Sequence, residues 1–473
     1  MSINGENSHV KLSIPMNVGI HALEFYFPKN YVDQSKLEEF DNVSSGKYTI
    51  GLGQKQMGFF CDHEDINSIC LTVLENLLQK NEIDRNSIGY LSVGTETIID
   101  KSKSVKTVLM NLFGLNSDIE GVDVKNACFG GTQALFSAID WVYSNWETEK
   151  RYAIAVMGDV AIYEPGRARC TGGAGAFAVL IGPDAPFVFE KGTRSCYMED
   201  LYDFYKPIGG MASDFPVVNS ELSLDSYLIA AEKCYRSYCL KYSKLYNKNI
   251  CLGDFDSIMF HCPFTRMIQK ALAKLSYMDY TSNKREHLID VEMLNGFHLT
   301  SVDELKSRSL LNACLHSSSI LWETKTKPNT FFNARIGNMY TPSLYAQLVA
   351  RIGRMNENIE DENILPFLLF SYGSGCASSM FSIKCNITPL NKLIYLKIRK
   401  SCIDAVDRLE QRIEVTPEYY TKRLLEREDL LQGKVPYTPY SLNNSERDNL
   451  FPGTFYLKSV DAKYVREYDI FKE

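Results

Sequence analysis

The chain has 473 residues, of which 45% are hydrophobic and 23% charged, so it is long enough to bury a large core. Its formal net charge of −7 argues against nucleic acid or an anionic membrane as the main partner, whereas a small anionic ligand needs only a local basic pocket. No segment approaches the roughly 18 uncharged apolar residues of a membrane span.

The 13 cysteines show no regular spacing and include no CxxC pair, which argues against a zinc site. Residues 1–16 lack the apolar core of a signal peptide and the arginine-rich, acid-poor character of a transit peptide. We therefore expect a reduced, cytoplasmic protein that binds no metal.

Apolar runs typical of buried strands alternate with helical patterns along most of the chain, which indicates an α/β fold. The first half predicts, in order, strand 88–98, helix 106–115, strand 151–160 and strand 173–183. The second half repeats this order with strand 257–264, helix 265–276, a turn and helix at 337–348, and a strand pair at 365–385. The tail predicts one charged helix at 403–432 and a hairpin at 454–469.

A cysteine lies between a strand-like run and a helix in KNACFGGTQALFSAIDWVYSNW (125–146). A helix N-terminus carries unsatisfied N–H groups and a positive dipole end, so this pattern predicts a lowered pKa for the thiol of Cys128. Gly130 and Gly131 carry no side chains and are predicted to leave room for a second molecule. The alternative is a small, buried structural cysteine, and this stretch alone does not decide between the two.

Two further side chains could take part in proton transfer. Glu96 ends an apolar run in VGTETIID, and partial desolvation there would raise its pKa and make it a better base near neutral pH. His261 follows the buried run SIMF and could donate to a carbonyl from a fixed position. The ordinary alternatives are a surface glutamate and a core histidine.

Basic residues follow His261 at a spacing of four, at Arg266, Lys270 and Lys274, which places them on one helix face. Such a stripe is usually solvated, but beside an active site it could hold the phosphates of a nucleotide-bearing substrate. Ser374 in SYGSG and Asn338 in GNMYT lie at glycine-containing turns and could donate to a developing oxyanion.

Taken together, seven motifs resemble the eukaryotic 3-hydroxy-3-methylglutaryl-CoA synthase family: GKYTIGLGQ, VGTETIIDKSKSVKT, NACFGGT, YDFYKP, FHCPF, GNMYT and SYGSG. The resemblance runs from about residue 16 to the final hairpin. It implies a thiolase-like α/β fold with two similar halves in a five-layered αβαβα arrangement. The expected division is a flexible N-terminus (1–15), an N-terminal half (16–185) and a C-terminal half with a helical and hairpin tail (186–473).

The activity that this resemblance implies is condensation of acetyl-CoA with acetoacetyl-CoA, after which water releases 3-hydroxy-3-methylglutaryl-CoA for isoprenoid synthesis in the cytosol. The CoA thioesters are substrates, and no cofactor is expected. The family resemblance also implies a homodimer, with neither nucleic acid nor membrane as a partner.

By the same resemblance, Cys128 is the nucleophile that carries the acetyl group and Glu96 is the general acid/base. His261 binds and orients acetoacetyl-CoA, and the backbone N–H groups of Cys128 and Ser374 donate to the acetyl oxygen. Further substrate-binding positions, with Lys270 near the CoA phosphates, are Asn338, Thr171, Ser223 and Lys270.

The sequence departs from the family pattern at positions expected to contact substrate. Arg167 stands where asparagine is common, and Arg266 stands where lysine is common. Ser44 and Ser45 stand where an acidic residue and alanine are common near the CoA nucleotide. These differences are expected to alter CoA affinity and to leave the chemistry of the cysteine, glutamate and histidine unchanged.

Two other functions fit part of the pattern. A ketoacyl synthase needs no base like Glu96, and a biosynthetic thiolase would use a second cysteine, for which Cys376 beside SYGSG is the candidate. A non-catalytic paralogue or thiol redox sensor would also expose a reactive Cys128.

Overall fold

The computed structural model describes residues 14–166, 168–207, 215–282, 284, 288–297, 307–357, 364–431, 433–442 and 449–472. Within these residues the main feature is a ten-stranded sheet built from both halves of the chain. The first half contributes β1 (Gly19–Tyr26), β4 (Ile88–Gly94), β5 (Asp123–Val124), β6 (Tyr152–Ala161) and β7 (Gly173–Gly182). The second half contributes β8 (Phe187–Phe189), β9 (Ser195–Met198), β12 (Ser257–Phe260), β13 (Leu365–Gly373) and β14 (Ala377–Cys385).

The order and direction of the strands repeat in the two halves. The sheet runs β12-β13-β14-β8-β1-β7-β6-β4-β5, and β9 pairs with β14. In each half one parallel pair (β4–β6, β12–β13) is followed by an antiparallel pair (β6–β7, β13–β14) and a second antiparallel pair (β7–β1, β14–β8). The prediction of two similar halves is therefore confirmed.

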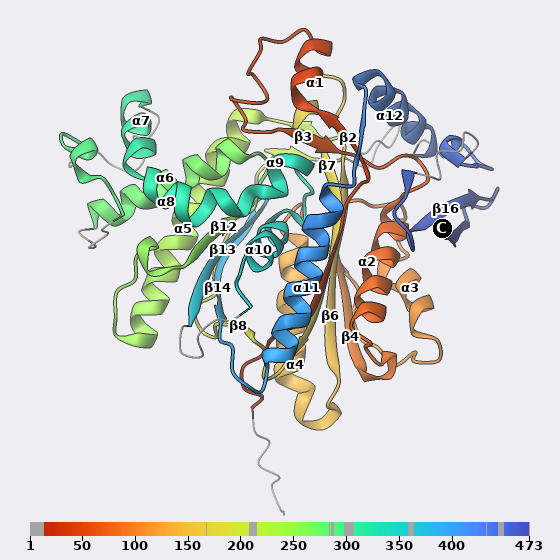
Figure 1. Cartoon of the computed structure of the whole chain (residues 1–473), viewed down its shortest axis with the longest axis horizontal. Coiled ribbons are helices and arrows are strands. Elements are labelled where there is room, and N and C mark those ends of the chain that lie inside the picture. Colours follow the sequence, from red (N-terminus) through yellow and green to blue (C-terminus); the bar gives the residue numbers. More distant parts are fainter. Residues whose placement is uncertain are drawn as a thin grey trace, which may run out of the picture.

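Helices separate and cover the two parts of the sheet. Figure 1 shows, from left to right, α5 and α6, then β12–β14, then α10, α11 and α4, then β6 and β4, and finally α2 and α3. The bounds of these helices are α2 (Ile66–Lys80), α3 (Val105–Leu109), α4 (Gly130–Glu149), α5 (Ser220–Tyr246), α6 (Thr265–Thr281), α10 (Ser343–Gly353) and α11 (Lys392–Leu409). Helix α4 packs on β4 and β6, and α5 packs on β13 and β14. This is the five-layered, thiolase-like arrangement predicted from the sequence.

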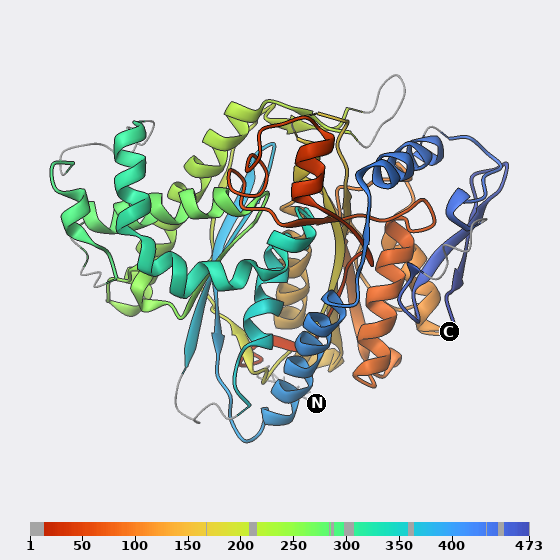
Figure 2. The same cartoon turned by 45° about the horizontal axis from the view of Figure 1, so that its top comes forward.

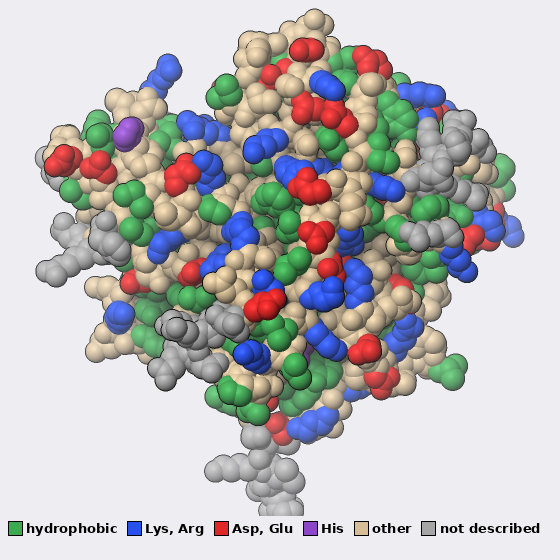
Figure 3. Space-filling model, viewed as in Figure 1, with side chains coloured by type: hydrophobic (Ala, Val, Ile, Leu, Met, Phe, Trp, Pro, Cys, Tyr) green, Lys and Arg blue, Asp and Glu red, His purple; other side chains and the backbone are tan. Residues whose placement is uncertain are grey.

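The central strands are buried because helices cover them on both sides. All ten residues of β7 are buried, and β6 is buried from Ala153 onward. Strands covered on both faces read as continuous apolar runs, which is why they were recognisable in the sequence. Lysine, arginine and carboxylate side chains are interspersed over the face of the molecule seen in Figure 3. No helix within the described ranges combines the length and apolarity needed to cross a membrane.

The remaining elements are short connections and a tail. They are α1 (Gln34–Phe40), β2 (Asn30–Asp33), β3 (Gln56–Gly58), β10 (Phe204–Tyr205), β11 (Val217–Val218), α7 (Arg308–Ser317), α8 (Ser319–Leu321), α9 (Asn333–Ile336), α12 (Pro417–Leu431), β15 (Ile413–Val415), β16 (Phe455–Val460) and β17 (Arg466–Ile470). The predicted hairpin is confirmed as β16–β17, which lies beside α2 at the right of Figures 1 and 2.

The single helix predicted over residues 403–432 is wrong. Helix α11 ends at Leu409, β15 follows, and α12 begins at Pro417. Strand β15 pairs in parallel with β2, and the N–H of Ile413 donates to the carbonyl of Lys29. This long-range pairing overrides the local helical pattern, and Pro417 at the start of α12 has no N–H to continue a helix from before it.

Candidate active site

Glu96 and Cys128 meet where two adjacent parallel strands end. Glu96 follows β4 by two residues, and Cys128 lies between β5 and α4. Since Gly94 of β4 pairs with Val124 of β5, the two segments leave the sheet side by side. The thiol of Cys128 donates to Oε2 of Glu96 over 3.4 Å. The predicted strand–turn–helix setting of the cysteine is thus present.

The turn that carries Cys128 is tight. Ala127, directly before the cysteine, has φ of 42°, in the left-handed region that non-glycine residues seldom adopt. The corresponding turn of the second half, before α10, contains Tyr340 with φ of 53°. Residues with strained backbone persist where the surrounding structure holds them, and they are concentrated at functional sites.

The two glycines after Cys128 have a different role from the one predicted. A Cβ on Gly130 would lie 2.8 Å from the carbonyl oxygen of Val124, and one on Gly131 would lie 2.8 Å from Cγ of Met157 and 3.0 Å from Cβ of Thr341. The glycines therefore allow α4 to pack closely on its own protein, and the prediction that they leave room for an acyl group is wrong.

A buried aspartate holds the site together. One carboxylate oxygen of Asp159, on β6, accepts from the backbone N–H groups of Glu96 and Thr97 over 2.8 and 3.0 Å and from the hydroxyls of Thr95 and Thr97 over 2.9 Å. Its other oxygen accepts from the backbone N–H of Thr341 over 3.0 Å and from the hydroxyl of the same residue. Asp159 thus ties the Glu96 segment to the turn before α10.

The carboxyl group of Glu96 is poised to gain and lose a proton near neutral pH. Burial raises its pKa, and the ammonium group of Lys206, 3.2 Å from Oε1, offsets part of this increase, so that the pKa is about 7. A general acid/base works best when its pKa lies near the working pH. The predicted desolvation of Glu96 is confirmed.

The predicted lowering of the Cys128 pKa is wrong. Burial raises the pKa of this thiol well above its ordinary value, and the carboxylates of Glu96 and Asp159 raise it further. These effects on the pKa outweigh the lowering expected from the N-terminus of helix α4. The partial positive charge there is smaller than the full negative charge of a carboxylate at hydrogen-bond distance. Cys128 is therefore a protonated thiol that must lose its proton as it attacks.

His261 stands directly after β12, which occupies in the second half the place that β4 occupies in the first. Its backbone N–H donates to Phe370, and its carbonyl accepts from the hydroxyl of Tyr227 over 2.6 Å. Burial lowers the pKa of the imidazole to about 3, so the ring is neutral at working pH. A neutral imidazole can donate from one nitrogen and accept at the other.

The SYGSG turn packs against the Cys128 turn. A Cβ on Gly373 would lie 2.5 Å from the carbonyl oxygen of Asn126 and from the backbone nitrogen of Phe129. The side-chain amide of Asn126 also donates to the carbonyl of Ser374 over 3.2 Å. The fold therefore brings Ser374 to the turn of the nucleophile, as the sequence-based assignment requires.

Most of the other predicted substrate-binding residues fall into two groups. Asn338 donates from its backbone to the carbonyl of Thr171 over 3.3 Å, so these two are neighbours. Arg266 in the first turn of α6 donates from its backbone to Leu52, at the end of the loop that carries the exposed Ser44 and Ser45. Lys270 lies one turn further along α6, and Ser223 lies in the first turn of α5. Arg167 lies outside the described residues.

Lys274, the third member of the basic stripe, has a structural contact instead. Its ammonium group lies 2.9 Å from Glu232 of α5, and both side chains are nearly buried. It joins α5 to α6, so it is not available to bind a ligand.

A cavity of about 590 Å³ opens beside Glu96. Its walls come from the segment after β4, the Cys128 turn, residues 200–207, the turn at Ser374 and the C-terminal hairpin. The hairpin contributes Tyr464 and Arg466, and Arg466 is held by Asp65 at the start of α2 over 2.7 Å. The C-terminal tail therefore forms part of the wall of this cavity.

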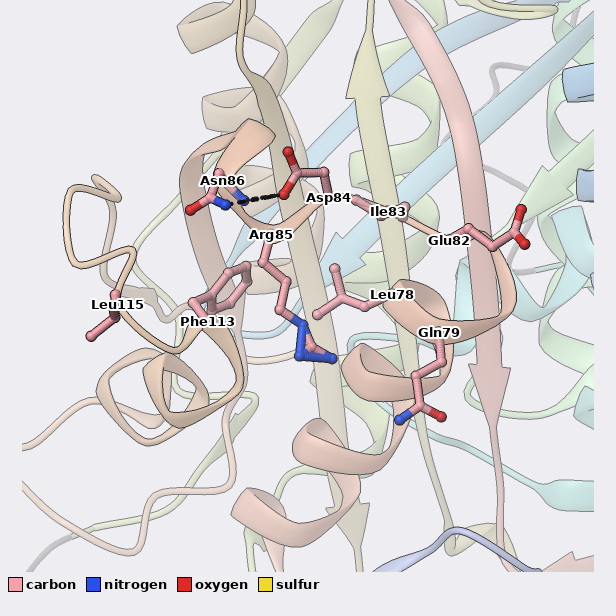
Figure 4. Close-up of a pocket in the computed structure, with 9 residues that line it drawn as sticks. All are labelled: Leu78, Gln79, Glu82, Ile83, Asp84, Arg85, Asn86, Phe113 and Leu115. Carbon is pink, nitrogen blue, oxygen red and sulfur yellow. Dashed lines mark hydrogen bonds between the residues drawn. The ribbon is translucent and has the colours of Figure 1, made fainter.

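A second hollow lies away from these residues, between the end of α2 and the segment that follows it (Figure 4). Arg85, which lines it, pairs with Glu75 over 2.9 Å, so its charge is already compensated. Among the described residues, no group of three or more histidine, cysteine, aspartate or glutamate side chains could hold a metal ion.

Comparison with known proteins accounts for nearly the whole chain. The family model for the N-terminal part of hydroxymethylglutaryl-coenzyme A synthase matches residues 14–186, and the model for the C-terminal part matches residues 187–471. The chain belongs to the hydroxymethylglutaryl-CoA synthase family.

Relatives and solved structures agree with this membership. A hydroxymethylglutaryl-CoA synthase of Caenorhabditis elegans is 47% identical over 97% of this chain and 95% of its own length. The cytoplasmic and mitochondrial human synthases are each 43% identical over 96% of this chain, and over 87% and 89% of their own lengths. The structure described as MvaS in complex with 3-hydroxy-3-methylglutaryl coenzyme A matches with a TM-score of 0.76 and 26% identity, covering 96% of this chain and 99% of that one.

The reaction of this family is the one expected from the motifs, condensation of acetyl-CoA with acetoacetyl-CoA to 3-hydroxy-3-methylglutaryl-CoA. The alternative of a thiolase with Cys376 as second nucleophile loses its basis. Cys376 belongs to the apolar core around α5 and α6. A protonated Cys128 likewise disfavours a redox sensor, because the thiolate is the oxidisable form.

Sequence reasoning assigned no role to four residues that lie close to Glu96 and Cys128. They are Asp159, Tyr163, Lys206 and Tyr340. Lys206 and Tyr340 lie in the motifs YDFYKP and GNMYT, so membership in these motifs was the available signal. Asp159 is a lone carboxylate in an otherwise apolar strand, a pattern that calls for a buried partner.

Proposed function

We propose that Cys128, Glu96 and His261 carry the condensation. The observation that supports this most directly is the contact between the Cys128 thiol and the Glu96 carboxylate, in a buried site where the pKa of Glu96 is about 7. A nucleophile and a base that touch each other can act on the same two-carbon unit.

In the first step Cys128 attacks the carbonyl carbon of acetyl-CoA. The new carbon–sulfur bond replaces the bond to CoA, and the thiol proton leaves with the CoA sulfur. The Glu96 carboxylate then takes a proton from the methyl group of acetyl-Cys128. Backbone N–H groups of Cys128 and Ser374 are proposed to stabilise the enolate oxygen, since each such donor contributes about 2.7–4 kcal/mol in a dry site.

The enolate carbon next attacks the ketone carbon of acetoacetyl-CoA. The ketone oxygen takes its proton from Glu96, which returns to the carboxylate form, while the neutral imidazole of His261 donates to a carbonyl of this substrate. Water finally cleaves the thioester to Cys128, leaving a free carboxylate on the product and a thiol on the enzyme.

Substrate binding is proposed to use both groups of residues described above. The Ser44–Ser45 loop and α6, with Arg266 and Lys270, form a cationic surface suited to CoA phosphates. The four remaining proposed contacts near the acyl groups and pantetheine are Thr171, Ser223, Asn338 and Arg167. The CoA thioesters are the substrates, and no further cofactor is proposed.

We also propose a cytoplasmic homodimer that feeds isoprenoid synthesis and has neither nucleic acid nor membrane as a partner. The relatives include cytoplasmic and mitochondrial forms, and the cytoplasmic human form supports the proposed compartment. Dimerisation is supported by β5, a strand at one end of the sheet, beside which Val122 is 65% exposed. Exposed strand edges are ready templates for pairing with another chain.

The experiment is release of free thiol from acetyl-CoA and acetoacetyl-CoA, supplied together and singly, with mass identification of the product. Wild-type protein should need both substrates and form 3-hydroxy-3-methylglutaryl-CoA, and Cys128→Ala should release none. Product formation by Cys128→Ala at the wild-type rate would refute the assignment of the nucleophile.

A further inference from the structure

The carboxylate of Glu96 has two different neighbours, one at each oxygen. Oε2 accepts from the thiol of Cys128, whereas Oε1 lies 3.2 Å from the ammonium group of Lys206. The lysine side chain is 15% exposed and that of Glu96 is 5% exposed, so water screens this pair only weakly. A cation so placed both orients the carboxylate and favours its ionised form.

The position of Lys206 is determined by the surrounding fold. Asp203, three residues earlier, is buried and accepts from the backbone N–H of Gly375 over 2.9 Å and from the hydroxyl of Tyr372 over 3.0 Å. The ammonium group also lies over the ring of Tyr340, 4.7 Å from its centre. The segment that carries the lysine is thereby attached to the turn of Ser374 and to the turn before α10.

Titratable and charged groups face Glu96 from several elements. They are Cys128 before α4, Asp159 on β6, Tyr163 after β6, Tyr340 before α10, and Lys206 after β10. Four of these are acidic or neutral, and Asp159 opposes ionisation of Glu96. Lys206 favours it most, and the thiol of Cys128, which donates to Glu96, adds a smaller contribution.

We infer that Lys206 is a positioning residue that favours the ionised form of Glu96 and keeps Oε2 of its carboxylate turned toward the acetyl group on Cys128. This inference rests on the proposed role of Glu96 as general acid/base. The carboxylate is regained when Glu96 gives its proton to the ketone oxygen, and a second carboxylate appears on the product when water cleaves the thioester. Lys206 compensates negative charge at both stages.

The test is the pH profile of kcat for condensation in the full-length protein, compared among wild type, Lys206→Met and Lys206→Arg. With a Glu96 pKa of about 7, the wild-type rate should rise with pH through that value, because the base is the ionised form. This rise in rate is the acidic limb of the profile. Loss of the cation should move its midpoint upward by about one pH unit or more, which lowers the rate at pH 7 about fivefold. Arginine should restore the limb.

Lys101→Met is the matched control, because Lys101 is an exposed lysine on the wall of the same cavity. Its acidic limb should stay at the wild-type pH. An unmoved limb in Lys206→Met with a lowered kcat would overturn the inference and leave Lys206 with a packing role. A rise in KM without a shift of the limb would overturn it too, because the lysine would then contact substrate.

Acetylation of Cys128 from acetyl-CoA, read by mass, separates this inference from the proposed function. Lys206→Met should acetylate fully, whereas condensation by Glu96→Ala at the wild-type rate would refute the role of Glu96 itself. If Lys206→Met does not fold, judged by circular dichroism and gel filtration, Lys206→Gln provides the same measurement with a polar side chain.

Discussion

At the scale of single residues, the site depends on charges placed close to a partly buried thiol. Cys128 is protonated because burial and two carboxylates, Glu96 and Asp159, all disfavour the thiolate. The same burial brings the pKa of Glu96 to about 7 and keeps His261 neutral. Acetyl transfer and enolate formation thus start from a neutral thiol, an ionisable carboxyl group and a neutral imidazole.

Replacement of Glu96 should separate the two chemical steps. We expect Glu96→Ala to acetylate Cys128 from acetyl-CoA but to condense about 10²–10⁴-fold more slowly, because the base for the methyl proton is gone. Loss of this carboxylate also lowers the pKa of the thiol, so alkylation of Cys128 by iodoacetamide should become fast at lower pH than in wild type. Loss of acetylation together with condensation would contradict the assigned role.

Arg167 should act on binding rather than on turnover. If this residue contacts a CoA substrate, Arg167→Asn should change the KM of that substrate by about tenfold, the value of one hydrogen bond to a charged group. Steady-state kinetics with each substrate varied in turn measures this effect, with kcat close to wild type. Unchanged KM values for both substrates would remove Arg167 from the site.

At the scale of elements, the site is assembled where turns from the two halves pack against each other. The turn before α4 carries Cys128, and the turn before α10 carries Thr341, which bonds to Asp159. The turn between β13 and β14 packs against the Cys128 turn at Gly373. Close approach of three backbones requires positions without side chains, which explains the glycines of NACFGGT and SYGSG.

A methyl group at Gly373 should therefore disturb the nucleophile. In Gly373→Ala the new Cβ would clash with backbone atoms of Asn126 and Phe129, so we expect the free energy of unfolding to fall by about 1–3 kcal/mol and condensation to slow. Urea unfolding and the thiol-release assay measure the two effects. Gly353→Ala, at the end of α10 with only ordinary contacts at 3.5 Å, is the control and should change stability by less than about 1 kcal/mol. Equal behaviour of the two variants would contradict the packing argument.

At the scale of the whole molecule, two halves with the same strand order face each other across a shared helical layer (Figure 1). Equivalent strands of the two halves are followed by Glu96, after β4, and by His261, after β12. The C-terminal hairpin is anchored to the start of α2 by the ion pair between Arg466 and Asp65, and it forms part of the wall of the cavity beside Glu96.

The end of the sheet at β5 should form the contact between two copies of the chain. We expect light scattering to give twice the mass of one chain, and Val122→Asp to reduce it toward one chain, because a buried unpaired charge at such a contact is costly. A monomeric mass for the wild type at micromolar concentration would contradict the proposed homodimer.

Local pattern was enough to predict the α/β class and most of the strands and helices, whereas the two-half fold and the proposed roles of the cysteine, glutamate and histidine came from the resemblance of seven motifs to a known family. Periodicity and motif spacing are properties of short segments, so they are visible in the chain itself. The ionisation of Cys128, the ties made by Asp159, the pairing of Lys206 with Glu96 and the break between α11 and α12 were decided only in the tertiary structure. Each depends on burial or on a partner distant in sequence, and both the energy of a charge and the pairing of a strand are set by neighbours in space.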